Sequence, residues 1–143
     1  MMLKAVVHLS IFSLRIMSEY KYFKPGEFQW CSPPCRIDQM DSKFMDKLDQ
    51  AREIAGVPFH LNSAFRSLDW EIKQGRSGTS SHTKGCAVDI HALTPRIKWQ
   101  ILSALIQVGF TRFGLYPTFI HVDGDSSKPS SIWVESASPK KDL

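Results

Sequence analysis

Two short segments alternate apolar residues with histidine and aspartate, and this pattern constrains the fold more than any other feature of the sequence. Residues 86–91 read CAVDIH, and residues 118–123 read TFIHVD. Because successive side chains of a strand point to opposite faces, each segment is predicted to be a strand with one apolar face. Asp89 would lie on the polar face of the first strand, and His121 and Asp123 on that of the second. A polar pair within an apolar strand is costly unless it is satisfied, so these side chains need partners.

The rest of the chain supplies helices that could cover the apolar face of such a sheet. Residues 41–55 and 95–108 each repeat apolar residues at spacings of three and four, which is typical of an amphipathic helix. A strand, a short helix and a third strand are expected at residues 58–64, 68–73 and 110–116. The third strand would form a hairpin with the TFIHVD strand, and residues 132–134 could dock nearby. We therefore expect an α+β fold in which a small antiparallel sheet is flanked by helices.

The chain has 143 residues, which suits one domain, and its 43% hydrophobic content is that of a globular protein. We expect that domain over residues 41–135, after an irregular arm over residues 17–40 and before a frayed tail over residues 136–143. Residues 1–16 are interpreted as an N-terminal extension or an upstream start. This stretch is too short and too interrupted to span a bilayer, so no stable membrane insertion is expected.

Charge and cysteine content argue against a nucleic-acid-binding protein and against a protein held together by a complete disulfide framework. The net charge is +4, but the basic residues are dispersed and no strand face interleaves them with aromatic residues, so nucleic-acid binding is not expected. Three cysteines are an odd number, which excludes a complete disulfide framework. Cys31 and Cys35 either close a small disulfide loop or remain two ordinary thiols near a turn.

Three residues in the two strand regions have the chemistry of metal ligands. His82 and Asp89 stand seven residues apart with Gly85 between them, and a tight turn there could bring both side chains toward one point. His121 adds a second imidazole. Two histidines and one carboxylate suit zinc and leave a fourth position for water, which is the pattern of a catalytic site. The alternatives are a surface histidine and a strand aspartate with local hydrogen bonds, and an isolated hydrogen bond between His121 and Asp123.

A third candidate lies at the end of the strand predicted over residues 58–64. The sequence there reads Ser63-Ala64-Phe65-Arg66-Ser67. An arginine that leaves a strand beside an aromatic residue can hold a carboxylate or a tetrahedral oxyanion with its paired donors. The alternative is a surface arginine in an ordinary salt bridge.

These motifs together resemble a known family. The pattern SxHxxGxAxD from Ser80 to Asp89, the preceding SAFRS at residues 63–67, and the late FIHVD at residues 119–123 occur in the order found in the zinc D-alanyl-D-alanine carboxypeptidases. That metallopeptidase superfamily includes the vancomycin-resistance D,D-peptidases, several phage endolysins and the fold of the Hedgehog amino-terminal domain. The small size and the YPTFIHVD ending look most like compact phage-encoded members.

The resemblance implies a zinc-dependent peptidase that hydrolyses peptidoglycan stem peptides, as a D,D-carboxypeptidase or an endopeptidase, through zinc-activated water. His82, Asp89 and His121 would bind Zn²⁺. Arg66 would be catalytic and bind the substrate, and Ser80 would support the loop or touch the substrate. Such a protein is expected to act on the cell wall as a monomer, made in the host cytoplasm if it is phage-encoded.

The resemblance does not supply the general base. Some relatives carry a glutamate three residues before the last zinc histidine, and others a histidine two residues before it; here these positions are Thr118 and Phe119. Asp123 remains, either as the base or as the partner that orients His121. His91, two residues after Asp89, is a weaker candidate for the base. If none of these residues serves as the base, the alternatives are a slow enzyme and a non-catalytic cell-wall-binding or interaction domain of the same fold.

Overall fold

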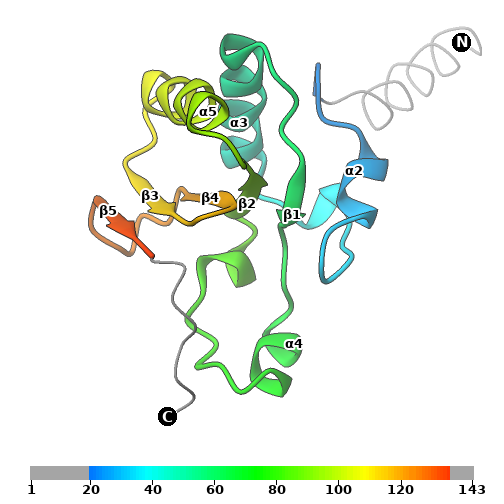
Figure 1. The fold of residues 1–143 in the computed structure, drawn as a ribbon. Coiled ribbons are helices and arrows are strands. Elements are labelled where there is room, and N and C mark those ends of the chain that lie inside the picture. The colour runs from blue at the N-terminus through cyan, green and yellow to red at the C-terminus, as the bar shows by residue number, and fades with distance from the viewer. Residues whose placement is uncertain (1–19, 136–143) are drawn as a thin grey trace, which may run out of the picture.

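The computed structural model describes residues 20–135. The expectations for residues 1–16 and 136–143 lie outside this range. The fold is α+β, with a five-stranded sheet in the order β1-β2-β4-β3-β5. Helices α3 and α5 lie together on one side of the sheet, and α4 lies on the other (Figure 1). The elements are α2 Pro25–Gln29, η1 Ile37–Gln39, α3 Ser42–Ala55, β1 Leu61–Ser63, α4 Leu68–Lys73, η2 Ser81–Lys84, β2 Ala87–His91, α5 Pro95–Gln107, β3 Arg112–Leu115, β4 Phe119–Asp123 and β5 Ser131–Val134.

The two long helices begin and end where the sequence predicts. The Asp41 side chain accepts a hydrogen bond from the Phe44 amide and so caps α3, and Gly56 ends that helix in the left-handed conformation with φ of 67°. Thr94 caps α5 in the same way, through the amide of Ile97. Both helices turn their apolar stripe into the hydrophobic core, where Leu48 of α3 and Leu105 of α5 are fully buried.

The sheet differs from the expected antiparallel arrangement at one edge. Strands β1, β2, β4 and β3 pair antiparallel to their neighbours, whereas β5 pairs parallel to β3. After β4 the chain returns through residues 124–130 to the start of β3, where the Ser131 amide donates to the Thr111 carbonyl. Because this loop brings the chain back to the beginning of β3, β5 runs in the same direction as β3, and the sheet is mixed.

The segment expected as an irregular arm has more structure than predicted. Within residues 20–40 it forms α2 and η1, and it buries Phe23 and Phe28 against the core. Cys31 and Cys35 are buried here as free thiols. In the described part of the chain, no helix has the length and the apolar character needed to cross a membrane.

Candidate metal centre

The loop before β2 places His82 beside the sheet. Ser80 caps the short helix η2, since its hydroxyl accepts from the His82 amide at 3.3 Å. Its carbonyl oxygen accepts from both the amide and the hydroxyl of Thr83, at 3.0 and 2.7 Å. Gly85 then ends η2 with φ of 69°, and the chain enters β2 directly. Ser80 therefore supports the loop that holds His82, as one of its two predicted roles requires; its contact with substrate stays a prediction.

The other two candidate ligands lie side by side in the sheet. Asp89 of β2 is the register partner of His121 of β4, so both side chains project from the same face at the same level. The Asp89 Oδ1 atom is 3.0 Å from His121 Nδ1 and 3.4 Å from His82 Nε2. The two imidazole rings are 5.2 Å apart between centroids. The structure thus brings together the three residues predicted from the sequence.

These three side chains form a donor set that fits a divalent metal ion. One ligand atom from each of His82, Asp89 and His121 lies within 4.8 Å of the other two. His82 and Asp89 are buried, and His121 is half-buried, so the cluster has one open side. Two neutral imidazole nitrogens and one carboxylate are a common ligand set for first-row metals, zinc above all.

The outer nitrogen of each histidine is held by a protein acceptor. His82 Nδ1 is 2.7 Å from the carbonyl oxygen of Ala64, which can only accept, so this nitrogen carries the proton. His121 Nε2 is 2.8 Å from the Asp123 carboxylate and donates to it. Each histidine therefore turns its other nitrogen toward Asp89, and this is how protein partners orient metal-binding imidazoles.

The Asp89 carboxylate is kept ionised by its neighbours. Burial alone would raise its pKa, but when the inner nitrogens of His121 and His82 are protonated as well, their hydrogen bonds and charges outweigh burial and hold the pKa well below the usual value. An ionised carboxylate is what a metal ligand requires.

Asp123 lies on the side of His121 that faces away from Asp89. Its Oδ2 atom accepts from His121 Nε2, while its Oδ1 atom accepts from Arg112 Nε at 2.8 Å and from the Asp125 amide at 3.1 Å. The residue is 2% exposed. Burial tends to raise the Asp123 pKa, but these hydrogen bonds and the Arg112 charge lower it. Both oxygens thus have partners, and His121 stands between this carboxylate and the Asp89 carboxylate.

Arg66 reaches the cluster from the end of β1. Its Nε donates to Ser63 Oγ at 2.8 Å, and its Nη2 donates to Asp89 Oδ2 at 3.1 Å. Its Nη1 is 3.2 Å from Glu71 Oε1. Since a guanidinium has five N–H groups, these three bonds leave one N–H on each terminal nitrogen. Arg66 is therefore fixed at the edge of the donor set with donors that a substrate oxygen could accept from.

Sequence reasoning missed Glu71. This side chain is 0% exposed, and its carboxylate pairs with both Arg66 and Arg76. A carboxylate is rarely buried unless it is paired, so Glu71 fixes the position of Arg66. Its only sequence signal is its place on the short helix predicted just after Arg66, which identifies no partner.

Comparison with models of known protein families gives a match. The family model for peptidase M15 matches residues 21–123, which include all three candidate ligands, Arg66 and Asp123. A search of curated proteins found no match.

Proposed function

The chain belongs to the peptidase M15 family of metal-dependent peptidases, and from this premise we propose that it is a zinc peptidase of peptidoglycan stem peptides. The observation that carries the proposal is the convergence of His82 Nε2, His121 Nδ1 and the Asp89 carboxylate, with the outer histidine nitrogens already occupied. A zinc ion held by these residues would polarise the peptide carbonyl and lower the pKa of water.

The protein side chains around this donor set would bind and orient the substrate. The two N–H groups that remain on Arg66 point to a carboxylate or to the carbonyl oxygen of the scissile bond as their acceptor. A peptidoglycan stem offers both groups next to D-alanine. Removal of a terminal D-alanine and cleavage of an internal bond are both compatible with this arrangement.

Asp123 would act as the partner that orients His121, the second of its two predicted roles. Its hydrogen bond to His121 Nε2 fixes the tautomer and the ring orientation of a ligand, and Arg112 fixes Asp123 in turn. The position of Asp123 behind the imidazole favours this role over that of a base.

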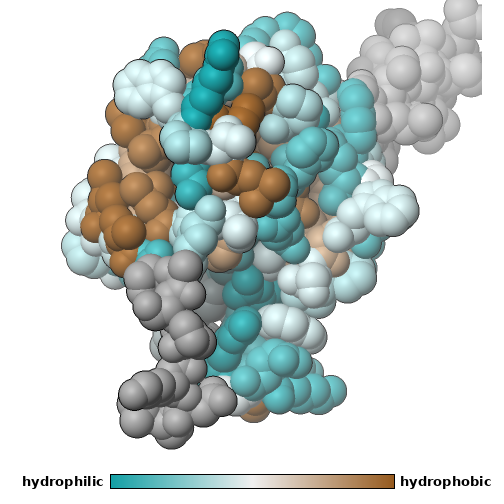
Figure 2. All heavy atoms as spheres, in the orientation of Figure 1, coloured by the Kyte–Doolittle hydropathy of each residue, from teal (hydrophilic) through white to brown (hydrophobic). Residues whose placement is uncertain are grey.

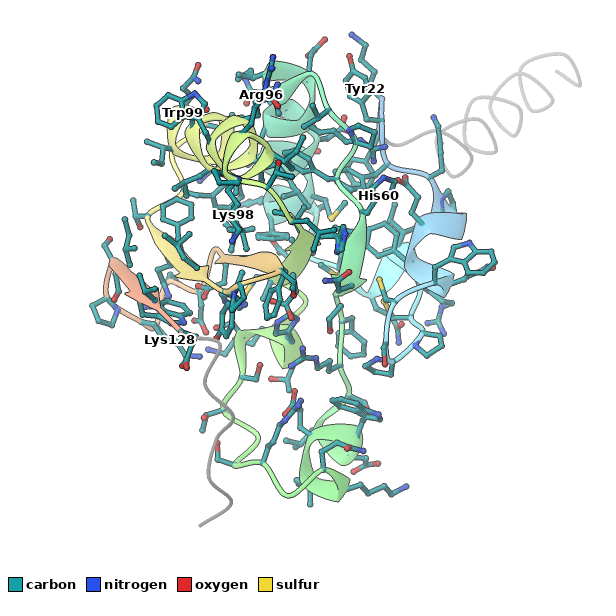
Figure 3. The ribbon with its side chains drawn as sticks, in the orientation of Figure 1. Tyr22, His60, Arg96, Lys98, Trp99 and Lys128 are labelled. Carbon is teal, nitrogen blue, oxygen red and sulfur yellow. The ribbon has the colours of Figure 1, made fainter. Side chains whose placement is uncertain are left out.

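Digestion of purified peptidoglycan, read by mass spectrometry, tests the proposal. The protein is used as prepared, after treatment with a chelator, and after zinc is added back. Loss of terminal alanine indicates a carboxypeptidase, and freed stem peptides indicate an endopeptidase; either product should disappear with chelation and return with zinc. His82→Ala should abolish the product. His60→Ala is the matched control, because His60 is an exposed histidine that precedes β1 (Figure 3). Absence of product under every metal condition would refute the proposal.

A further inference from the structure

The segment that follows the family match is tied to the metal centre. The match ends at residue 123, and residues 124–134 form the loop after β4 and strand β5. From this loop, Asp125 accepts from Ser81 Oγ at 2.8 Å, next to the candidate ligand His82. Lys128, labelled in Figure 3, donates to the Thr79 carbonyl and to Ser81 Oγ, both at 2.9 Å. The loop therefore braces the turn that carries His82.

Strand β5 brings Trp133 to the same level of the sheet as the ligands. Register partners run across all five strands from Ser63 through Asp89, His121 and Gly114 to Trp133. Because Gly114 has no side chain, the indole lies over it; a Cβ at Gly114 would be 2.6–2.8 Å from three indole atoms. The Trp133 and His121 rings are 5.4 Å apart between centroids.

The remaining contacts of Trp133 build an aromatic wall, which we define as Trp133, Tyr116 and Phe119. Trp133 Nε1 donates to the Tyr116 hydroxyl at 3.2 Å, and the Tyr116 and Phe119 rings stack with centroids 4.2 Å apart. All three residues are half-buried. The Tyr116 hydroxyl accepts the indole N–H, and among residues 20–135 its own proton has no acceptor, so it is available to a ligand.

The two sides of the cluster differ in charge. Arg66 lies on the β1 side, whereas the aromatic wall is uncharged and is formed by β5, the residue after β3 and the first residue of β4. Arg112 lies 5.3 Å from the Trp133 ring, but its charge is paired with Asp123. A peptide across the cluster would thus meet a cation at one end and an apolar surface at the other.

We propose that the aromatic wall, with Trp133 at its centre, is the specificity-determining side of the metal site and takes an uncharged side chain of the substrate. This inference rests on the proposed zinc peptidase function. Desolvation of a charged side chain against the three rings would be unfavourable, while a small apolar side chain gains contact area there. The wall thereby selects neutral residues such as alanine next to the cleaved bond.

The first test measures proximity to the metal without using activity. Co²⁺ is added to the wild-type protein and to Trp133→Phe, and tryptophan fluorescence is recorded. Bound Co²⁺ should quench the emission of Trp133, because its indole lies beside the ligand histidine His121. The loss of fluorescence on adding Co²⁺ should therefore be larger in the wild type than in Trp133→Phe, which has no indole at this position. Equal quenching in the two proteins would overturn the proposal.

The second test measures substrate preference. We compare an acylated stem peptide that ends in D-Ala-D-Ala with analogues that carry D-Glu at either of the last two positions. The wild type should prefer the neutral residue at one position by about tenfold or more in kcat/KM. In Trp133→Ala that preference should fall to less than about threefold, whereas Trp133→Phe should retain most of it.

The matched control is Ile132→Ala, on the same strand. Apolar side chains gather over β5 in Figure 2, and Ile132 on this strand is 60% exposed. Its register partner is Phe113 rather than Gly114, and strand alternation places its side chain on the face opposite to that of Trp133. This variant should keep the wild-type preference. If Trp133→Ala does not fold, Trp133→Gln replaces it, because glutamine keeps side-chain volume but removes both the ring and the apolar surface.

The outcomes separate the two proposals. A wild-type protein that neither binds zinc nor cleaves peptide would remove the proposed function, and this inference with it. Zinc binding and cleavage together with an unchanged preference in Trp133→Ala would overturn only the aromatic wall as the specificity-determining side.

Discussion

Asp123 contacts His121 at the nitrogen opposite to Asp89, and this placement determines how its replacement should affect the protein. Asp123→Ala removes the acceptor that holds the imidazole, so zinc affinity should fall about 10–100-fold. Asp123→Asn keeps an oxygen that can accept from Nε2 and should lose less. Competition with a chromophoric chelator measures the affinity. A loss of kcat at unchanged zinc affinity would instead assign Asp123 the role of base.

Replacement of Glu71 tests whether this residue acts by holding Arg66 in position. In Glu71→Gln the buried partner of Arg66 loses its charge, so kcat/KM should fall roughly 10–100-fold as the guanidinium loses its orientation. The free energy of unfolding should fall by about 1–3 kcal/mol because Arg66 keeps a neutral acceptor but loses one of its two anionic partners.

Arg76→Gln is the control for this change. Arg76 shares Glu71, but its side chain is 49% exposed and makes no bond to Asp89 in the described part of the chain. Its replacement should cost less than about 1 kcal/mol and leave turnover close to that of the wild type. Urea unfolding and steady-state kinetics measure both effects. Equal loss of turnover in the two variants would show that Glu71 does not act through Arg66.

Among the elements, the short helix η2 ends at Gly85, and backbone atoms of neighbouring residues leave no space for a side chain at this position. Gly85 has φ of 69°, and a Cβ there would collide with the Gln39 carbonyl oxygen and lie 3.2 Å from the Asp41 amide nitrogen. Gly56 has φ of 67°, but open space surrounds it. Gly56→Ala should therefore cost about 1–2 kcal/mol, from backbone strain alone, and Gly85→Ala clearly more. Denaturant unfolding of both variants measures this difference; equal costs would contradict the close contact.

The loop between β4 and β5 is joined to η2 by Asp125. Burial tends to raise the pKa of this carboxyl, but hydrogen bonds from Ser127, Ser81 and Lys84 outweigh it and lower the pKa below its usual value. A group with a lowered folded-state pKa stabilises the protein above its unfolded-state pKa, and this contribution is lost as the pH falls. Asp125→Asn should thus be less stable than the wild type at pH 7, and the difference should shrink below about pH 4. A difference in unfolding free energy that stays constant from pH 7 to pH 3 would exclude this linkage.

The elements also show which parts of the fold could be predicted from the sequence. The long helices α3 and α5 and the alternating strands β2 and β4 have strong local periodicity, so residue spacing alone locates them and the face that bears His121. The parallel pairing of β5 has no such local signal, because it depends on where the loop after β4 returns. The contacts of Glu71 with Arg66 and of Trp133 with His121 lack a local signal as well, because they depend on how helix α4 and strand β5 pack in the fold.

At the scale of the whole molecule, the three candidate ligands come from three different elements: η2, β2 and β4. In an unfolded chain His82 and His121 would be far apart, so a metal that binds all three ligands binds the folded state preferentially. Such binding stabilises the fold by an amount that grows with the ratio of free metal to the dissociation constant, about 2.7 kcal/mol at a hundredfold excess.

Zinc should therefore raise the melting temperature. For a chain of this size, that stabilisation corresponds to a rise of roughly 5–10 °C in Tm. Differential scanning calorimetry with a chelator, and then with increasing free zinc, measures it. His82→Ala should abolish the rise, because the remaining pair cannot link η2 to the sheet, while the exposed His60→Ala control should preserve it. If Tm did not change with zinc in the wild type, the cluster would not bind the metal. Zinc-dependent catalysis at this site would then be excluded without a substrate assay.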